Sequence, residues 1–351
     1  MGENREPDFL RQIRLAIVGL GLMGGSLALA LRGRCAAVFG VDPDPATLDL
    51  ARRMDLVDAA AADPAALLPQ ADAIVLAAPV NAILRLLGEL PELHPGPALV
   101  LDLGSTKGAI VEAMKQLPPR FVALGGHPMC GRERGGLAQA EAGLFRGATF
   151  AFCPVAPVET QDIASRSRPK QYIDPGNVPP EPQGPLPQCS DRVTSETQNL
   201  ASLRTSGQFA LALCDAIGAR PLWIDAETHD RWVASTSHLP YLVANALAAS
   251  TPLEASPLVG SGFRSATRLA PTPTGMILDV LQTNSQNILD AARRFCEALS
   301  RIESLLTEGD FAGLQELLEQ GGQRQLELLA AHEGNHAVPG ALTAAERGDF
   351  I

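Results

Sequence analysis

Short apolar runs alternate with amphipathic helical segments over the first part of the chain. Residues 14–19 form an apolar run that ends in glycine, which is typical of a strand buried on both faces. The same reasoning predicts strands over 37–41, 72–77, 98–103, 121–124 and 149–153, and helices over 24–31, 47–53, 82–90 and 108–117. Strands that alternate with helices across short loops indicate a doubly wound parallel sheet, an α/β fold of the Rossmann type, over residues 12–156.

The pattern changes twice further along the chain. Residues 157–206 hold eight prolines and no periodic apolar face, so we expect a disordered, exposed insertion there. Helical periodicity follows, and it predicts an all-helical second domain over 207–330, with helices over 208–217, 227–250, 275–306 and 311–329. Long helices with an apolar face often pack against a second copy, which predicts a homodimer. The polar segment 331–351 is expected to be a loose tail.

Charge and cysteine content narrow the partners. The net charge is −11 and the basic residues form no run, so nucleic acid and membrane surfaces are not expected as partners. The six cysteines are scattered without metal-ligand spacing, which predicts buried thiols, no metal, and a reducing compartment, the cytoplasm. No apolar stretch is of membrane-spanning length, and the N-terminus does not resemble a secretory leader.

A glycine-rich turn follows the first predicted strand and opens the first predicted helix. The segment 19–24, GLGLMG, fits the dinucleotide fingerprint G-x-G-x-x-G, in which a pyrophosphate sits at a helix N-terminus. Asp42 ends the second strand, where its carboxylate would accept from ribose hydroxyls and repel a 2′-phosphate, which favours NAD over NADP. Asp42 equally suits a turn or helix cap. The predicted cofactor-binding residues are Gly19, Gly21, Leu22, Met23, Gly24, Asp42, Ala78 and Pro79.

Polar side chains follow two later strands of the predicted sheet. A histidine side chain can exchange a proton near neutral pH, so His127 suits the removal of a proton from a substrate hydroxyl while a nicotinamide accepts hydride. Ser105 can bridge the nicotinamide region and a substrate oxygen, or it can cap the helix that follows. Lys107 lies in the first turn of that helix, where a solvated side chain is the plain expectation.

The helical region adds two candidate clusters. His229 and His238 are nine positions apart, and Asp230 and His238 are eight apart. Eight positions are about two helical turns, so the latter pair can share a face. The two histidines either have a functional role or serve as core or capping residues. Arg264 and Arg268 lie in a glycine-bearing loop. A guanidinium there can bind a substrate carboxylate through two parallel hydrogen bonds, or form a surface salt bridge.

Taken together, these segments resemble the prephenate/arogenate dehydrogenase family. The resemblance covers 14–155 and 207–320 and is carried by GLGLMG, GSTKG, HPMCGRE, THDRWVASTSHLP and GFRSATRLA. It implies a Rossmann domain, a helical dimerisation domain and an active site between them. It also implies NAD-dependent oxidative decarboxylation, in which His127 takes the proton of the ring hydroxyl. By the same resemblance Ser105 holds that hydroxyl, Arg268 binds a carboxylate, Glu133 orients Arg268, and His238 lines the substrate pocket.

Three positions depart from the family pattern. Tyr241 stands where many relatives carry a second histidine, Ile277 where many carry tryptophan, and Arg132 where threonine or proline is common. All three are expected near the substrate side chain. The positive charge of Arg132 disfavours an ammonium group, so prephenate, converted to 4-hydroxyphenylpyruvate, is the expected substrate.

Three alternatives stay open at the level of sequence. The first is arogenate as the substrate, with tyrosine as the product. The second is a β-hydroxyacid dehydrogenase or imine reductase, whose sequences also start with GLGLMG. The third is an NAD-binding sensor without activity.

Overall fold

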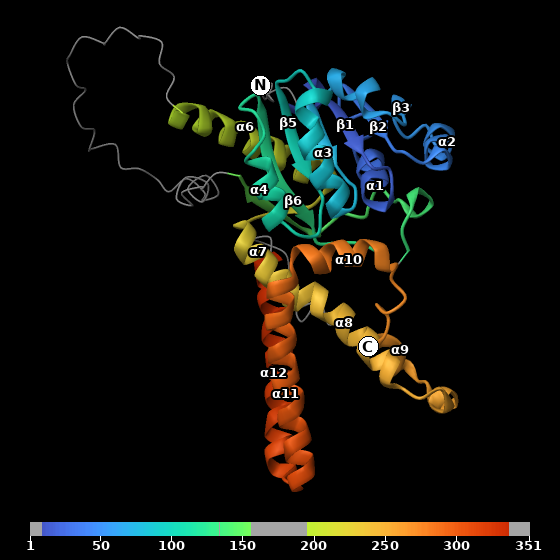
Figure 1. The fold of residues 1–351 in the computed structure, drawn as a ribbon, viewed down its shortest axis with the longest axis vertical. Helices are drawn as coiled ribbons and strands as arrows, with labels where there is room; N and C mark the ends of the chain where they lie inside the picture. Colours follow the sequence, from blue (N-terminus) through green and yellow to red (C-terminus); the bar gives the residue numbers. More distant parts are fainter. Residues whose placement is uncertain (1–8, 133, 156–194, 337–351) are drawn as a thin grey trace, which may run out of the picture. The chain divides into compact units, whose positions relative to one another are not determined.

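The computed structural model describes residues 9–132, 134–155 and 195–336 (Figure 1). The described residues up to His229 form one compact unit, and those from Asp230 onward form a second. The first unit is built on a β-sheet with helices on its faces, and the second consists of helices. This confirms the predicted fold class, a Rossmann-type sheet followed by a helical region.

The described residues of the first unit form one sheet of eight strands. Its order is β3-β2-β1-β4-β5-β6-β7-β8, and all neighbours are parallel except β6 and β7. The chain leaves β1 for one edge and returns to β4 on its other side, so β1 and β4 flank the switch point at which such sheets bind ligands. The strands are β1 (Arg14–Val18), β2 (Ala37–Val41), β3 (Ala59–Ala61), β4 (Ala73–Leu76), β5 (Ala98–Asp102), β6 (Phe121–Pro128), β7 (Thr149–Pro154) and β8 (Arg220–Trp223).

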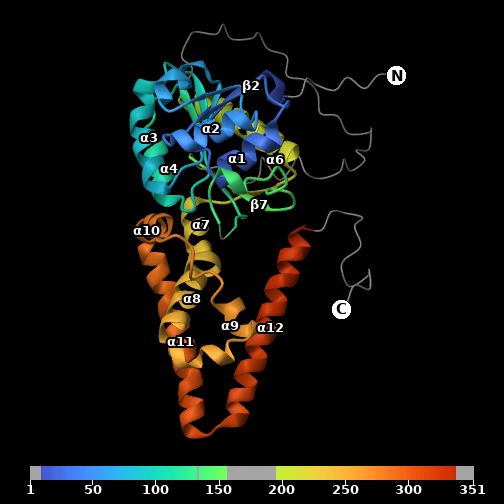
Figure 2. The same cartoon turned by 90° about the vertical axis from the view of Figure 1, so that its right-hand side faces the viewer.

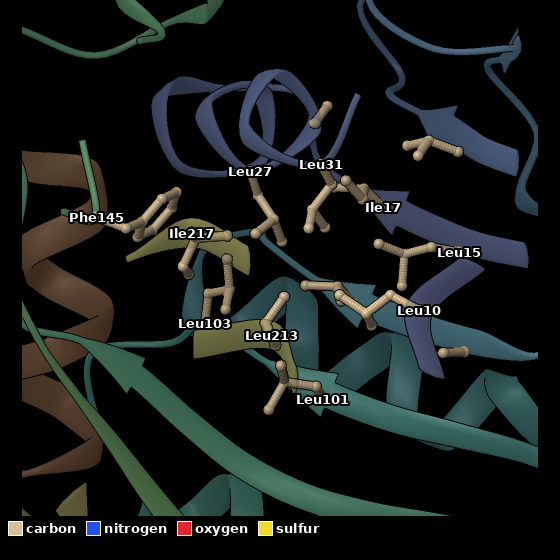
Figure 3. Packing of buried hydrophobic residues seen from close by; sticks show 14 of the residues in the cluster. Leu10, Leu15, Ile17, Leu27, Leu31, Leu101, Leu103, Phe145, Leu213 and Ile217 are labelled. Carbon is tan, nitrogen blue, oxygen red and sulfur yellow. The ribbon is translucent and has the colours of Figure 1, made fainter. Parts of the chain in front are cut away.

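Helices cover both faces of this sheet, and each face has its own apolar core. Alternate residues of β1 show the division, because Ile17 belongs to one core and Ala16 to the other. The first core includes side chains of α1, α2 and α6, and Figure 3 shows those of α1 and α6 together with residues of the strands. The second core includes side chains of α3 and α4. The helices are α1 (Leu22–Leu31), α2 (Pro45–Arg53), α3 (Val80–Leu93), α4 (Gly108–Met114) and α6 (Ser195–Ile217).

The structure differs from the sequence prediction between 195 and 229. Residues 195–206 were expected in the insertion, but they form the first half of α6, whereas 156–194 lie outside the described residues. The second half of α6 packs in the core of the sheet through Phe209 and Leu213, and β8 pairs with β7. Residues 207–229, which we expected in the helical domain, therefore belong to the compact unit of the sheet.

The helices of the second unit follow the predicted pattern with two breaks. The predicted helix 227–250 contains a π-helical turn, η5 (Ala234–His238), just before Pro240. A wider turn is understandable there, because proline has no N–H to donate and its ring crowds the preceding turn. The predicted helix 275–306 is interrupted at Asn284. The helices are α7 (Ala226–Val233), α8 (Leu239–Ser250), α9 (Ser261–Ala266), α10 (Thr274–Thr283), α11 (Ser285–Glu308) and α12 (Phe311–His336).

The last helix is longer than predicted, and most of its described side chains are exposed. α12 continues to His336, so the first residues of the expected loose tail are helical, and 337–351 lie outside the described residues. α12 doubles back on α11, and the two helices diverge from the turn between them (Figure 2). None of the helices in the described ranges combines the length and apolarity that crossing a bilayer requires.

Candidate active site

The glycine turn between β1 and α1 is shaped by close backbone contacts. Gly19 has φ +97°, and a Cβ there would lie 2.4 Å from the carbonyl oxygen of Ala77. A Cβ on Gly24 would lie 1.9 Å from the carbonyl oxygen of Gly19. Gly21, in contrast, has no atom within 4 Å of its Cβ position. Two glycines thus allow the turn to close, and the third leaves open space beside the N-terminus of α1, where backbone N–H groups favour an anion.

The other predicted cofactor-binding residues lie at the same edge of the sheet. Leu22 and Met23 form the first turn of α1, and Ala78 and Pro79 follow β4. The amide of Ala77 donates to the carbonyl of Val18 over 2.7 Å, which joins the ends of the two central strands. The structure therefore places these residues at the switch point of the sheet, where a dinucleotide binds in this fold.

Asp42 ties the end of β2 to the glycine turn. Its Oδ2 accepts from the amide of Leu20 over 2.8 Å, and its Oδ1 accepts from the amide of Asp44 over 3.0 Å. The helix cap is Asp44, which accepts from the amides of Ala46 and Thr47. Hydrogen bonds from Thr47 and from the Ala46 amide hold the pKa of Asp44 below its usual value. Asp42 therefore does not cap α2, but it does make a turn contact beside the glycines.

Ser105 lies in the loop between β5 and α4. The cap position of α4 is occupied by Lys107, and α4 has no side-chain cap among the described residues. The alternative of Ser105 as a helix cap is therefore wrong. Its side chain is half-buried beyond the carboxyl end of β5, on the side of the sheet where the glycine turn also lies.

Lys107 is fully buried, which contradicts the expectation of a solvated side chain. Its ammonium forms an ion pair with the Oδ2 of Asp102, which is also fully buried, and donates to the carbonyl of Gly126 over 2.7 Å. Asp102 in turn accepts from the amides of Gly104, over 2.7 Å, and Gly126, over 3.0 Å. The pair thus connects the loop that carries Ser105 to the residue before His127. Nothing in the spacing of the sequence pointed to it.

His127 lies near the end of β6, and its ring meets a second imidazole. The Nδ1 of His127 is 3.0 Å from the Nε2 of His229, with the ring centroids 5.1 Å apart at 65°. His127 is half-buried, whereas His229 in α7 is only 2% exposed. An N–H···N contact needs one ring to donate and the other to accept. His229 was not among the predicted site residues, although it lies nine positions before His238 in the same candidate cluster.

The segment after β6 carries two further candidates. The guanidinium of Arg132 forms an ion pair with Glu141, and both side chains are about half exposed. Glu133 lies outside the described residues. Burial raises the pKa of the nearby Cys130 thiol to about 11, so this cysteine stays protonated near neutral pH and is not a nucleophile.

In the second unit, His238 lies at the end of η5 and is buried. The side-chain amide of Asn284 lies 3.3 Å from the Nδ1 of His238 and donates to the carbonyl of Asp230 over 2.7 Å. A buried asparagine therefore holds His238 beside the backbone of Asp230. Asn284 was not predicted, because it falls inside the predicted helix 275–306, where nothing in the sequence distinguishes it. Tyr241 is buried in the next turn of α8.

Arg268 lies in the turn after α9, and its side chain is exposed. Arg264 is exposed within the same short helix. A backbone hydrogen bond 2.9 Å long, from the amide of Thr267 to the carbonyl of Phe263, joins the end of α9 to the turn that follows it. Arg268 is thus a surface residue of the second unit.

Two family models match this chain. Residues 27–168 match the model for the nucleotide-binding domain of prephenate dehydrogenase, and residues 225–320 match the model for its dimerization domain. The two matches together span more than half of the chain, in the order of the two units. The chain belongs to the prephenate/arogenate dehydrogenase family.

Members of the prephenate/arogenate dehydrogenase family are also found among characterised relatives and solved structures. Prephenate dehydrogenase of Bacillus subtilis (strain 168) is 27% identical over 86% of this chain and 72% of its own length. Prephenate dehydrogenase of A. aeolicus, solved with hydroxyphenyl propionate and NAD⁺, is 25% identical at a TM-score of 0.70, over 90% of this chain and 98% of its own. Synechocystis arogenate dehydrogenase is 28% identical at a TM-score of 0.64, over 90% and 99%.

Proposed function

We propose that this chain is an NAD-dependent dehydrogenase that converts prephenate to 4-hydroxyphenylpyruvate and carbon dioxide. Family membership supports the reaction class, and relatives that act on prephenate and on arogenate support a cyclohexadienol substrate. The observation that carries the mechanism is the contact between His127 and His229, because it orients one imidazole at the ligand-binding edge of the sheet.

We infer from this contact that Nε2 is the nitrogen of His127 that acts as the base. If Nδ1 of His127 carries its proton and donates to Nε2 of His229, the lone pair of His127 is on Nε2, directed away from His229. That nitrogen takes the proton of the substrate's 4-hydroxyl as the carbonyl forms. His229 is then a positioning residue, which stabilises the imidazolium by accepting its Nδ1–H. General-base action of this kind contributes about 10²–10⁴ in rate.

Proton and electron balance follow from aromatisation. The C4–H bond breaks with its electron pair as hydride, and the hydroxyl proton goes to His127. The ring carboxylate then leaves as carbon dioxide, and its bonding electrons make the ring a phenolate, which takes a proton back. The nicotinamide of the cofactor supplies the hydride acceptor.

The residues of the glycine turn fit a dinucleotide. Gly21 leaves open space beside the N-terminus of α1, and Asp42 lies beside this turn at the end of β2. We propose that the pyrophosphate binds over residues 19–24, that Asp42 accepts from the adenosine ribose, and that Ala78 and Pro79 line the same cleft. The A. aeolicus relative was solved with NAD⁺, which supports this cofactor.

A substitution that removes the charge of Asp42 tests the proposed preference for NAD over NADP. Asp42→Asn removes the carboxylate that repels a 2′-phosphate and accepts from the ribose. We expect kcat/KM to fall for NAD⁺ and to rise for NADP⁺, so that their ratio changes by at least about tenfold, or 1.4 kcal/mol. Asp44→Asn, which changes only the cap of α2, is the matched control. An unchanged ratio in Asp42→Asn would exclude Asp42 from the ribose site.

We also propose roles for the remaining predicted residues. Ser105 binds the 4-hydroxyl, and Arg268 binds a substrate carboxylate. His238 lies in the substrate pocket, where Tyr241 is its neighbour in α8. Arg132 forms an exposed ion pair with Glu141, which offsets its positive charge. Arg132 therefore favours prephenate over arogenate only if the bound substrate replaces Glu141 as its partner. Glu133 remains a predicted partner of Arg268.

One assay tests the proposed function directly. The purified chain is given NAD⁺ with prephenate and, separately, with arogenate, while NADH formation and carbon dioxide release are followed. We expect equal amounts of both products and a higher kcat/KM for prephenate. A higher kcat/KM for arogenate would reverse the substrate assignment. NADH binding without turnover of either substrate would contradict the enzyme and favour a sensor. Arg268→Ala is expected to raise KM for the substrate more than it lowers kcat.

The second unit supports a homodimer. α12 spans 26 residues, and its described side chains are exposed or half-exposed, including those of Phe311, Leu318 and Leu329. A helix draws most of its stability from packing an apolar face, so α12 needs a partner surface. We propose that a second copy supplies it, and the family model over 225–320 describes a dimerization domain. The cytoplasm remains the proposed compartment.

A further inference from the structure

The buried ion pair between Asp102 and Lys107 lies at the carboxyl end of β5, where it meets both loops of the proposed chemistry. Both side chains have 0% exposure. The two residues are five positions apart in sequence, so the pair closes the loop that contains Ser105. We propose that this ion pair is a positioning device that holds His127 and Ser105 in register for proton removal. The inference rests on the function proposed above and names residues that act through others.

The ion pair takes over where the parallel pairing of β5 and β6 ends. β5 and β6 pair from Ala98↔Phe121 to Leu101↔Leu124, and this pairing stops before Gly126. The carboxylate of Asp102 then accepts from the amide of Gly126 over 3.0 Å, and Lys107 donates to its carbonyl over 2.7 Å. Both polar groups of Gly126 are thus bound by the ion pair. The carbonyl of Gly126 belongs to the peptide bond that leads into His127.

Close packing makes this contact specific. A Cβ on Gly126 would lie 2.6 Å from the carbonyl oxygen of Asp102, so the two strands approach more closely than any other residue allows. On its other side β6 pairs with β7, with His127 opposite Ala151. His127 is therefore held from both sides, by a strand on one and by the ion pair on the other.

The same pair fixes the loop of Ser105. The Oδ2 of Asp102 accepts from the amide of Gly104 over 2.7 Å, while Lys107 is tied to the same carboxylate from the far end of the loop. Ser105 lies between these two anchors. The two segments that the ion pair binds are thus the ones that carry Ser105 and His127.

The test uses charge-free variants of the whole chain. Lys107→Met leaves the carboxylate of Asp102 buried without its ammonium, and this variant alone is expected to fold poorly. The double variant Asp102→Leu/Lys107→Met removes both charges together, a replacement that folds often tolerate. The matched control is Arg14→Met/Asp72→Leu, which removes a bidentate ion pair at the amino ends of β1 and β4.

For the double variant at Asp102 and Lys107 we expect kcat to fall on the order of a hundredfold, because a catalytic group displaced by about an ångström loses that much. KM for NAD⁺ and for substrate should stay within about twofold, while the melting temperature falls because Gly104 and Gly126 lose hydrogen-bond partners. A kcat within about twofold of the control would overturn the proposal. So would a rise in both KM values as large as the fall in kcat, since this indicates a general loss of structure.

A second readout needs no turnover, so it separates this inference from the proposed reaction. The imidazole Hε1 signal of His127, identified by its loss in His127→Asn, is recorded by NMR. We expect one sharp signal in the unchanged chain and in the Arg14/Asp72 control, and a broadened or split signal in the Asp102/Lys107 variant. If the unchanged chain proves inactive, the reaction is wrong and this signal still decides. A sharp, unshifted signal in the variant would overturn the positioning role.

Discussion

The two units of this chain differ in how far their apolar side chains are buried. In the first unit the apolar residues of the sheet and its helices gather in two buried cores, and even a lysine is enclosed with its partner. In the second unit the buried apolar cluster consists of Ala234, Ile288 and Ala291, while leucines along α11 and α12 are exposed. The first unit is complete in one chain, whereas the second requires another surface. Under the function proposed above, the contrast teaches that the proposed base lies in the unit with the larger buried core, while the surface proposed for assembly lies in the other unit.

The largest expected effect tests whether the first unit carries the chemistry. His127→Ala removes the proposed base, and we expect kcat to fall about 10²–10⁴-fold with the melting temperature preserved. His94→Gln is the matched control, since His94 is buried in the same unit but bonds to the carbonyl of Ala71 and the amide of Gly96. Steady-state kinetics with prephenate measure both. If His127→Ala keeps the activity of the unchanged chain, His127 is not the base and another residue must take the proton.

A second effect tests whether the second unit is incomplete alone. Leu318→Asp/Leu329→Asp places two charges on the exposed apolar side of α12. Each leucine contributes roughly 1.5–3 kcal/mol when buried, so we expect the dimer dissociation constant to rise at least about a hundredfold. Sedimentation velocity at several concentrations measures it. Gln320→Asp/Gln323→Asp adds the same charge on the same helix and should leave the dimer intact. A monomeric unchanged chain would refute the assignment.

A smaller effect sharpens the comparison within the glycine turn. Gly24→Ala drives a Cβ into the carbonyl of Gly19, so we expect roughly 1–3 kcal/mol of lost stability, as in other overpacked sites. Gly21→Ala enters open space, so its stability should be unchanged while the affinity for NAD⁺ falls on the order of tenfold. Thermal unfolding and NADH fluorescence separate the two. Equal destabilisation by both substitutions would contradict the open space beside Gly21.

The smallest effect lies at the solvent edge of the first unit. The Arg14 guanidinium, through its hydrogen bonds, holds the pKa of Asp72 below its ordinary value. A lowered folded pKa contributes stability above the unfolded pKa, near 3.9, and that contribution is lost as the pH falls through the folded pKa. Because the pair is partly exposed, Asp72→Asn should cost about 1 kcal/mol or less at neutral pH. Urea unfolding at several pH values should show the cost vanish in acid; a cost that grows in acid would contradict the lowered pKa.

Much of the fold follows from the sequence because buried parallel strands are continuous apolar runs. The runs that form β1, β2, β4 and β5 were recognised within one residue at each end. β3 is three alanines and β8 contains Pro221, so neither has a strand pattern, and pairing with a neighbour makes them strands. β6 extends past two glycines that read as a break, because β7 pairs with its last residues.

The candidate site was predictable where chemistry follows motif, and not where it depends on tertiary contact. The glycine turn and His127 stand at strand ends that the sequence pattern identifies. Lys107 looked like a surface residue of a helix start, because its partner at Asp102 is apparent only once β5 and β6 lie side by side. His229 and Asn284 were missed for the same reason, since each meets its histidine across a long stretch of chain.

Because His127 is held from both sides, the substrate preference of the enzyme can be altered apart from the position of this imidazole. The stretch 129–148, which includes Arg132, connects β6 to β7 beyond the residues that hold the imidazole. Within this stretch the side chain of Arg132 is exposed, whereas those of Leu137 and Phe145 are buried in the first core. We therefore expect a substitution at Arg132 to change the preference for the substrate side chain without displacing the proposed base, which makes this exposed position the place to introduce a new preference.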